Sequence, residues 1–413
     1  MTRTDEATMS TPQTEADLDV VVVGGCGHVG LPLAVALASR GSRVGIYDID
    51  ADAVAAVSRG ELRFREDGLQ ELLDEALDKE TLIASTDAAT IARGEVVVVV
   101  VGTPVDQHLN PDPQQVARAI EDVIGHYRDG QLVVLRSTVY PGVTQNVERL
   151  FARHGVAVDV SFCPERIAEG RAMTELFTLP QIVSGRTPHA RARAARLFGT
   201  LTDDIVELEP EEAELAKLFT NSWRYLKFAA ANQFYVMAND HGLDFERIRR
   251  AVTHEYPRAA DLPGAGFAAG PCLLKDTMQL AAFTDNSFVL GHAAMLVNEG
   301  LPLYVVTRLE ARRDLASSVV GLLGMAFKGE SDDIRSSLSY KLRRILEFRA
   351  AEVLTHDPYV TTDPRLLPLE EVVARADVLV IGAPHDAYRS LRAVAPDTEV
   401  VDIWNLLGEG TKA

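Results

Sequence analysis

The stretch DVVVVGGCGHVGLPLAVALASRGSRVGIYDID, residues 19–50, decides the fold of the first part of the chain. It starts with a run of four valines, passes through a glycine-rich turn into an apolar helical segment, and ends in a second β-type run. A buried strand, a helix and another buried strand in this order predict a βαβ unit, and such units build parallel sheets.

The turn carries Gly25, Gly27 and Gly30 in the spacing GxGxxG. Between a strand and a helix, these glycines permit a tight turn and a close approach of the backbone to a pyrophosphate. Asp48 ends the second strand, where a carboxylate binds a ribose 2′-hydroxyl and repels a 2′-phosphate. The alternative is a plain glycine turn beside an exposed aspartate. The combination favours a site for NAD over NADP, with contacts from the loop and the strand end: Gly25, Gly27, His28, Val29, Gly30 and Asp48.

Composition limits the class of protein. The 413 residues include 41 Lys+Arg and 60 Asp+Glu, a net charge of −19, which disfavours nucleic acid as a partner. Hydrophobic residues make up 47% and charged residues 24%, as in folded proteins of two or three domains. No apolar run approaches the ~20 residues of a membrane span, so we expect no membrane insertion and a cytoplasmic location. The three cysteines lack a CxxC spacing, so we expect neither a disulfide framework nor a metal site.

The remaining pattern predicts an α/β protein with two Rossmann-like parallel-sheet domains joined by a long central helix and a helical dimerisation region. Residues 209–240 contain no glycine and are rich in helix formers, which predicts that helix. Buried-strand runs occur near residues 95–102, 131–138, 158–165, 317–324, 350–358, 376–384 and 398–404. The expected order is a disordered leader at 1–17, an NAD-binding domain at 18–205, a central helical domain at 206–312 and an α/β domain at 313–413.

Polar residues follow several of the predicted strands. Thr103 and Thr138 stand at the carboxyl ends of parallel strands, where ligands bind, although each could cap a turn instead. Glu165 and Glu169 lie in a loop after a weaker strand and could act as bases, substrate contacts or solvated surface acids.

A lysine and an asparagine share one face of the long predicted helix. Lys217 and Asn221 are four residues apart and could hold an oxyanion together. The alternative is a helix-surface pair in which Lys217 bonds to Glu214.

The segment GAGFAAGPCLLKD, residues 264–276, contains a candidate nucleophile. Cys272 is followed by Lys275 and Asp276, and a nearby cation lowers the pKa of a thiol while a carboxylate can activate water. The alternative is an inert cysteine at the start of a helix.

Taken together, the motifs resemble those of the UDP-glucose/GDP-mannose dehydrogenase family along nearly the whole chain. The matching stretches are GCGHVGLPLA at 25–34, GTP at 102–104, STVYPGVT at 137–144, PERIAEG at 164–170, LAKLFTNSWR at 215–224, GPCLLKD at 270–276 and GMAFKGESDDIRSS at 324–337.

The resemblance implies two successive hydride transfers to NAD, which oxidise the C6 alcohol of a nucleotide-linked sugar to a carboxylate. It implies that Cys272 forms a thiohemiacetal and then a thioester, that Asp276 activates water and that Lys217 and Asn221 hold an oxyanion. Glu169 and Thr138 would position a water. By the same resemblance the cofactor contacts include Thr103, Thr138, Lys275 and Arg335, and the substrate contacts include Glu165, Lys217, Asn221, Arg258, Gly270 and Lys328. Arg258 would reach the substrate of a second subunit, so the resemblance also implies a homodimer.

The sugar is less closely defined by these motifs. GPCLLKD departs from the GGSCFPKD form that members often show, and His28 replaces a commonly aromatic residue. Lys275 and Asp276 favour oxidation of UDP-glucose or dTDP-glucose, with UDP-N-acetylmannosamine, UDP-N-acetylglucosamine and GDP-mannose as alternatives. Two other classes remain open: a two-electron β-hydroxyacid dehydrogenase, and a catalytically idle NAD-binding regulator.

Overall fold

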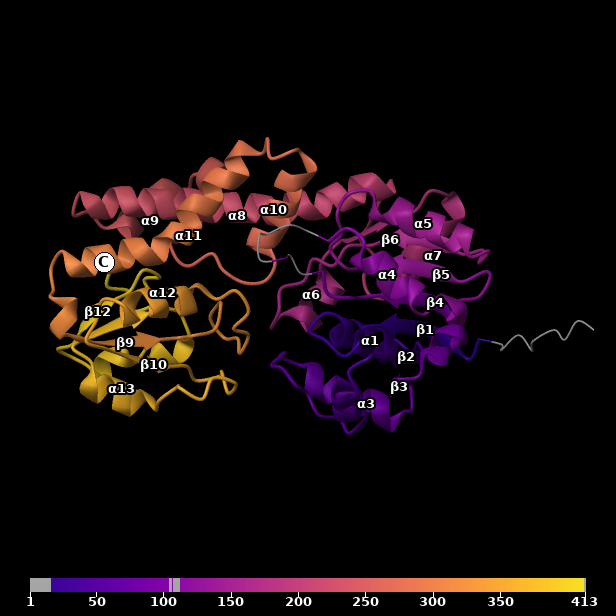
Figure 1. The fold of residues 1–413 in the computed structure, drawn as a ribbon, viewed down its shortest axis with the longest axis horizontal. Coiled ribbons are helices and arrows are strands. Elements are labelled where there is room, and N and C mark those ends of the chain that lie inside the picture. Colours follow the sequence, from indigo (N-terminus) through magenta and orange to yellow (C-terminus); the bar gives the residue numbers. More distant parts are fainter. Residues whose placement is uncertain (1–15, 104–105, 107–111, 412–413) are drawn as a thin grey trace, which may run out of the picture. The chain divides into compact units, whose positions relative to one another are not determined.

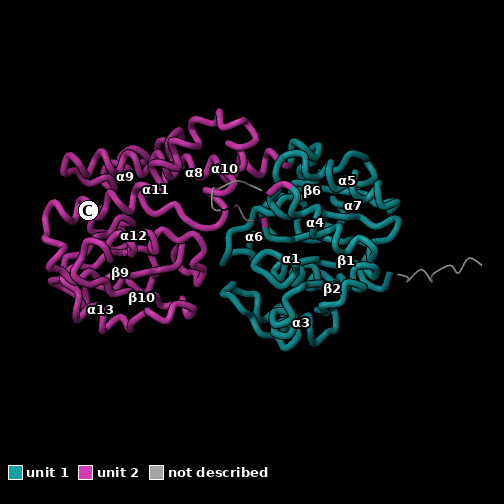
Figure 2. Tube along the Cα trace, in the orientation of Figure 1, with its two compact units in different colours: residues 1–102, 114–213 teal, residues 103–113, 214–413 magenta. Residues whose placement is uncertain are grey.

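The computed structural model describes residues 16–103, 106 and 112–411, and the chain divides into two compact units (Figure 2). Unit 1 comprises residues 1–102 and 114–213, and unit 2 comprises residues 103–113 and 214–413. Residues 1–15 of the expected leader lie outside the described residues, while Asp17 accepts hydrogen bonds from Arg93.

Unit 1 is built on a six-stranded sheet in the order β3-β2-β1-β4-β5-β6, in which every pairing is parallel (Figure 1). Valine-rich strands suit its centre because a parallel sheet covered on both faces excludes water from both. The order reverses between β1 and β4, which puts a topological switch point at the end of β1. The strands are β1 (Leu18–Val23), β2 (Val44–Tyr47), β3 (Leu82–Ser85), β4 (Gly94–Val99), β5 (Leu132–Leu135) and β6 (Asp159–Phe162).

Helices connect these strands, and a second small parallel sheet completes the unit. The helix that follows the glycine turn, α1, is buried along most of its length and contacts α3 and α6. The helices are α1 (Gly30–Ser39), α2 (Ala51–Ser58), α3 (Leu69–Asp78), α4 (Gln115–Glu121), α5 (Val143–Arg153), α6 (Ala172–Thr178) and α7 (Pro188–Phe198). The small sheet pairs β7 (Gln181–Ser184) with β8 (Ile205–Leu208).

Unit 2 combines a helical part with a second parallel sheet (Figures 1 and 2). Its longest helix, α8 (Pro210–Asp240), has 31 residues, of which the first four belong to unit 1. The other helices of this part are α9 (Phe245–Thr253), α10 (Leu273–Phe283) and α11 (Val289–Glu310). By length and hydropathy α11 could cross a membrane, but core helices pass the same test, and Leu301, Val305 and Leu309 lie in the core of unit 2.

The second sheet has the order β10-β9-β11-β12, again all parallel. Its first strand, β9, lies inside the sheet with β10 on one side and β11 on the other, so the loop after β9 starts at a switch point. The elements are β9 (Val319–Leu323), α12 (Leu338–Glu347), β10 (Glu352–His356), α13 (Leu369–Arg375), β11 (Val378–Ile381), a short 3-10 turn η5 (Asp386–Tyr388), α14 (Leu391–Val394) and β12 (Glu399–Val401).

The predicted fold class is confirmed: the chain has two parallel Rossmann-like sheets and a long helix between them in sequence. The predicted central helical segment and the predicted C-terminal α/β segment fall together in unit 2. Three strands, β3, β7 and β8, were absent from the prediction; each has only four residues, of which at most two in a row are β-branched.

Candidate active site

The glycine loop between β1 and α1 is shaped for a ligand that approaches the backbone. A Cβ added at Gly30 would lie 2.6 Å from the Cα of Gly25, so the start of α1 packs directly on the loop and requires glycine. At Gly27 an added Cβ would meet nothing within 4 Å, so this glycine faces open space. The arrangement fits a pyrophosphate at the N-terminus of α1.

Asp48 lies where the ribose of a dinucleotide would bind, and it also fixes the glycine loop. Its Oδ2 accepts a hydrogen bond from the Cys26 amide at 3.0 Å, and its Oδ1 accepts one from the Asp50 amide at 3.1 Å. In the same loop the ring of His28 stacks on Phe64 at 4.2 Å, and Val29 immediately precedes α1. The predicted NAD contacts of the glycine loop and Asp48 therefore gather around one turn, while Thr138 follows β5.

Two of the three cysteines have thiols that resist ionisation. Burial raises the pKa of the Cys26 thiol to about 12, with further contributions from the negative charges of Asp48 and Asp50. Burial also raises the pKa of the Cys163 thiol to about 12. Cys272 is the exposed cysteine, so it is the one with access to a substrate.

The loop that carries Glu169 is held by two carboxylates of unit 1, the buried Glu66 and the partly buried Glu175. Glu66 accepts hydrogen bonds from the amides of Gly170 and Ala172, both at 2.7 Å, and Glu175 accepts one from the amide of Ala168 at 2.6 Å. Because these bonds fix the backbone on both sides of Glu169, the direction of its side chain is set by residues outside the PERIAEG motif.

Glu165, predicted to contact the substrate, is bonded on both carboxylate oxygens within unit 1. It is buried, and its Oε2 accepts hydrogen bonds from Arg136 Nε at 3.0 Å and Nη2 at 2.6 Å, while Oε1 accepts from the amides of Arg166 and Ile167. A buried carboxylate needs a cation and hydrogen-bond donors, and the fully buried Arg136 provides them. The structure thus gives Glu165 a place in the support of the loop.

The supporting role of Arg136 was not predicted from the sequence. Its guanidinium also donates to the Cys163 carbonyl and to Gln181 Oε1, both at 3.1 Å, and lies 4.5 Å from the centre of the Phe198 ring. An arginine inside the apolar run LVVLRST was the available signal, because a charge within a buried strand region requires a partner.

In unit 2, α8 and α10 bring four predicted residues together. Cys272 immediately precedes α10, and Asp276 lies one turn further on the same face. Asn221 Nδ2 donates to Asp276 Oδ2 at 2.5 Å, which joins the α10 pair to Lys217 and Asn221 on one face of α8. Lys217, Asn221 and Asp276 are all buried.

Lys275 completes this cluster. Its Nζ lies 2.7 Å from Asp276 Oδ1 and 3.5 Å from Thr103 Oγ1. The buried Asp276 carboxylate therefore has a cation on one oxygen and an amide donor on the other. Burial of such charged groups is costly, and proteins retain it mostly where chemistry requires it. Pro104 of the GTP motif lies outside the described residues.

The loop after β9 lies against the segment that leads to Cys272. Gly270 has φ +100°, and a Cβ there would lie 2.6 Å from the Phe327 ring, so the two motifs touch through a glycine. Lys328 follows Phe327 and has its Nζ 5.5 Å from that ring. Arg335, in the same loop, pairs with Asp333 through two of its nitrogens. Arg258 is exposed and pairs with Tyr256 within its own segment.

The arrangement in unit 2 can perform addition to a carbonyl. An exposed thiol provides the nucleophile, a lysine and an amide provide positive groups for an oxyanion, and a buried carboxylate can accept a proton from water. Thr138 and Glu169 lie in unit 1 at the carboxyl ends of β5 and β6. Lys328 follows β9 in unit 2, so these three candidates come after strand ends, where Rossmann-like folds bind ligands, whereas Lys217, Asn221, Cys272 and Asp276 belong to α8 and the start of α10.

Two Rossmann-like sheets and a glycine turn open to a dinucleotide define the class of NAD-dependent dehydrogenases, and the exposed Cys272 is the candidate nucleophile. The chain belongs to the UDP-glucose/GDP-mannose dehydrogenase family. Its NAD binding domain matches residues 19–202, its central domain residues 211–299 and its UDP binding domain residues 321–409.

Similar proteins are nucleotide-sugar dehydrogenases. UDP-N-acetyl-D-mannosamine dehydrogenase of Pyrococcus horikoshii is 32% identical, with 90% of each chain aligned. The solved structure of UDP-D-ManNAc dehydrogenase from Pyrococcus horikoshii has a TM-score of 0.87 and 28% identity, covering 95% of this chain and 97% of that one. The structure of a UDP-glucose dehydrogenase from Pyrobaculum islandicum has a TM-score of 0.86 and 27% identity, covering 96% and 99%.

Proposed function

We propose that this protein oxidises UDP-N-acetyl-D-mannosamine at C6 to the uronic acid, in a four-electron reaction that uses two NAD. The observation that carries the chemistry is the Asn221–Asp276 hydrogen bond, which joins the polar pair of α8 to the α10 segment next to Cys272. The sugar is supported by the relative from Pyrococcus horikoshii, which aligns over 90% of both chains and bears that substrate in its name.

The sequence alone favoured UDP-glucose or dTDP-glucose, and the relatives support the N-acetylmannosamine alternative better. UDP-glucose remains the second candidate because the similar structure from Pyrobaculum islandicum, with a TM-score of 0.86, is that of a UDP-glucose dehydrogenase. Small differences in pocket contacts separate such substrates, so the assay has to compare them directly.

The residues of unit 2 have complementary roles in this proposal. NAD, when bound, supplies the acceptor for the hydride that leaves the sugar in each oxidation. The Cys272 thiolate adds to the C6 aldehyde, and Lys217 Nζ and Asn221 Nδ2 stabilise the oxygen of the resulting thiohemiacetal. Its oxidation leaves a thioester at Cys272.

Hydrolysis ends the cycle and restores the thiol. Asp276 Oδ2 takes a proton from water as the water attacks the thioester carbonyl, and the C–S bond breaks to give the carboxylate and Cys272. Thr138 and Glu169 position a water that takes up the proton released in the oxidations. Lys328 binds the diphosphate of the substrate, since a lysine is a compact cation suited to phosphate oxygens.

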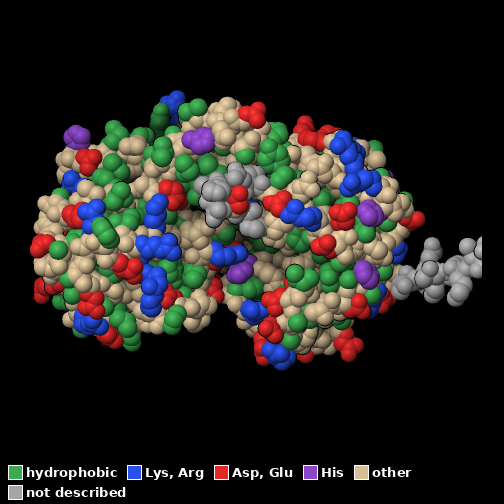
Figure 3. Space-filling view, in the orientation of Figure 1, with side chains coloured by type: hydrophobic (Ala, Val, Ile, Leu, Met, Phe, Trp, Pro, Cys, Tyr) green, Lys and Arg blue, Asp and Glu red, His purple; other side chains and the backbone are tan. Residues whose placement is uncertain are grey.

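We further propose that the protein is a cytoplasmic homodimer. On α8 the exposed side chains of Phe219, Trp223, Phe234 and Met237 fall within about 60° of one another at 100° per residue. On α11, Val289, Leu296 and Leu303 repeat every seven residues and are at least half exposed. Hydrophobic side chains are visible over this helical part of unit 2 (Figure 3). A second copy is the occupant that the family resemblance implies, and a long apolar helix stripe suits a two-fold contact.

The first test of the proposed function is stoichiometry. NADH absorbance is followed with UDP-N-acetylmannosamine, UDP-glucose, dTDP-glucose, GDP-mannose and UDP-N-acetylglucosamine, and NADH is counted per sugar consumed. Two NADH per UDP-N-acetylmannosamine, with the highest kcat/KM in the panel, are expected.

Cys272→Ser is expected to reduce overall turnover at least about 10³-fold, as removal of a catalytic nucleophile does. Cys163→Ala, a change at a buried thiol, is the matched control and keeps the activity. One NADH per sugar would contradict the thioester route and favour the hydroxyacid alternative, and no NADH with any sugar would favour the regulator.

A further inference from the structure

The loop from Gly324 to Ser337, between β9 and α12, carries Lys328 and is fixed at its start by a buried carboxylate. Asp357, just after β10, is 7% exposed. Its Oδ2 accepts hydrogen bonds from the amides of Met325 at 2.6 Å and Ala326 at 2.9 Å. These bonds hold the backbone two and three residues before Lys328.

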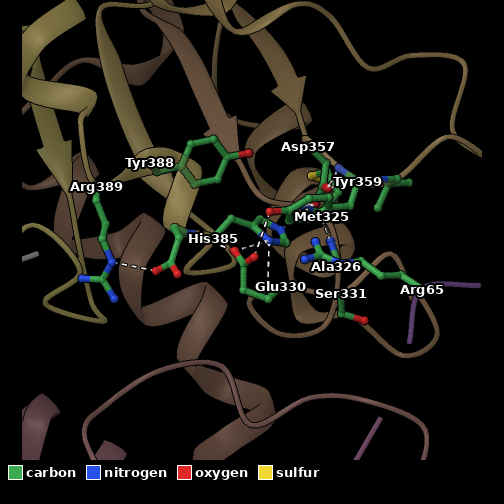
Figure 4. Close-up of polar contacts among 12 residues, drawn as sticks. Arg65, Met325, Ala326, Glu330, Ser331, Asp357, Tyr359, His385, Tyr388 and Arg389 are labelled. Atoms are coloured by element: carbon green, nitrogen blue, oxygen red, sulfur yellow. Dashed lines mark hydrogen bonds and ion pairs between the residues drawn. The ribbon is translucent and has the colours of Figure 1, made fainter. Parts of the chain in front are cut away.

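His385 extends this support to the other side of Lys328. The side chain is fully buried, its Nε2 lies 3.1 Å from Asp357 Oδ2, and its Nδ1 lies 3.0 Å from the amide nitrogen of Glu330. Because an amide N–H can only donate, Nδ1 accepts that bond, and Nε2 therefore carries the proton and donates to Asp357. One ring thus bonds both the backbone after Lys328 and the carboxylate that holds the backbone before it (Figure 4).

Glu330 adopts a backbone conformation that needs such support. Its φ is +56°, in the left-handed region that side-chain-bearing residues rarely adopt. Its carboxylate accepts hydrogen bonds from the Asp386 amide at 2.7 Å and from the Tyr359 hydroxyl at 2.8 Å. Next to it, a Cβ at Gly329 would lie 2.5 Å from the Pro384 carbonyl oxygen. Strained residues of this kind persist where surrounding contacts hold them, and they concentrate at ligand sites.

We propose that His385 is a positioning residue for nucleotide-sugar binding: through its bond to the Glu330 amide it fixes the backbone that sets the place of Lys328, and its bond to Asp357 holds the ring in the tautomer that accepts from Glu330. This inference rests on the proposed function, since it takes Lys328 as a contact of the substrate diphosphate. His385 acts through the loop and needs no contact with the ligand.

Two conservative variants separate positioning from simple stability. In His385→Asn the amide oxygen can occupy the place of Nδ1 and accept from Glu330, but the bond to Asp357 is lost. In His385→Gln the amide nitrogen can occupy the place of Nε2 and donate to Asp357, but the acceptor for Glu330 is lost. Each variant removes one hydrogen bond, so a merely structural role predicts similar losses of Tm and of affinity in both.

The experiment measures the Kd of UDP by titration calorimetry, KM for the nucleotide sugar and for NAD, and hydrogen exchange at the Glu330 amide. We expect His385→Gln to weaken UDP about tenfold, to raise KM for the sugar by a similar factor and to speed exchange at Glu330. His385→Asn keeps UDP affinity within about twofold, and both variants leave KM for NAD unchanged. His356→Gln is the matched control, because that ring bonds to the Leu367 carbonyl.

If His385→Gln fails to fold, Tyr359→Phe removes one bond to Glu330 at the edge of the network and is expected to weaken UDP a few-fold. Equal UDP affinities in the Asn and Gln variants, or affinities that follow Tm, would overturn the positioning role. Lys328→Ala separates this inference from the proposed function. If the wild type does not bind UDP, or if Lys328→Ala binds it normally, the proposed substrate site is wrong and the inference falls with it.

Discussion

The ion pair between Arg136 and Glu165 allows a quantitative test of how the loop of Glu169 is supported. Both side chains are less than a tenth exposed, and Arg136 makes four hydrogen bonds to three residues of unit 1. Arg136→Met keeps much of the apolar stem but leaves Glu165 buried without its cation. Removal of one partner of a buried pair costs about 3–5 kcal/mol, because the remaining charge is uncompensated.

The double variant Arg136→Met, Glu165→Gln removes both charges and keeps an amide oxygen for the backbone donors of Arg166 and Ile167. It loses hydrogen bonds but strands no charge, so we expect a cost of about 1–2 kcal/mol. The double variant is therefore expected to be more stable than Arg136→Met alone. The difference of about 2 kcal/mol between Arg136→Met and the double variant is the signature of a stranded buried charge.

The assay has to report unit 1. Both tryptophans of the chain, Trp223 and Trp404, belong to unit 2, so their fluorescence does not report β5. Native-state hydrogen exchange of the β5 amides gives the opening free energy of unit 1, and tryptophan fluorescence in urea serves as the internal control.

Arg186→Met is the matched variant, because Arg186 makes ion pairs with Glu148 and Glu211 at a side-chain exposure of 37%; it is expected to cost at most about 1 kcal/mol. The reasoning is refuted if Arg136→Met costs less than 1 kcal/mol, or if the double variant is no more stable than the single one.

Three other predictions follow from single positions. Gly27→Ala is expected to leave Tm nearly unchanged but to weaken NAD binding at least about tenfold in calorimetry, because the added Cβ enters only the open space of the glycine loop. In Gly30→Ala the added Cβ meets backbone atoms, so we expect a loss of about 1–3 kcal/mol of stability. Equal effects at the two glycines would argue against a ligand site in that space. Gly270→Ala is expected to raise KM for the sugar and lower Tm through its clash with Phe327, and a smaller side chain at 327 should restore part of both; no recovery would contradict the contact. The pKa of Asp357 is lowered to about 2: burial acts to raise it, but the hydrogen bonds from His385 and from the backbone amides of Tyr359 and Ala326 outweigh burial. Since the folded-state pKa lies below the ordinary 3.8, this group stabilises the fold above pH ~4, and about 2 kcal/mol is lost as the pH falls from ~4 to ~2. Tryptophan-monitored unfolding of Asp357→Asn should lack that loss, and an unchanged pH dependence would refute the assignment.

Local pattern was sufficient for the fold. Runs such as GEVVVV and the glycine turn before α1 can be recognised without knowing what they contact, since burial on both faces selects β-branched residues and a tight turn selects glycine. The helix over 209–240 was predicted almost to its observed bounds, Pro210–Asp240, because glycine is absent from it. The pairing of Cys272 with Asp276 on one helix face likewise follows from a spacing of four.

Contacts between distant segments could not be predicted in this way. Asn221 and Asp276 are 55 residues apart, and Glu66 and Gly170 are 104 apart. Neither Glu66 nor His385 stands in a motif, and a single glutamate or histidine in a polar stretch is usually a surface residue. The partner of Glu165 could not be predicted either: the glutamate stands in a visible motif after a strand, but the Arg136 that bonds it is 29 residues away.

The two loops that carry Glu169 and Lys328 are held by the same physical device. In each, a buried carboxylate from a distant part of the chain accepts two backbone amides next to the candidate residue: Glu66 in unit 1 and Asp357 in unit 2. Charge-assisted bonds of this type are stronger than those between neutral groups, and one carboxylate fixes two peptide planes at once. A loop fixed in this way loses little conformational entropy when ligand binds, which leaves more of the interaction energy for affinity and orientation. Glu66 and Asp357 therefore influence the site without contacting NAD or the sugar. Substituting either acid by the neutral amide should weaken ligand binding, through a less ordered loop, more than it lowers kcat.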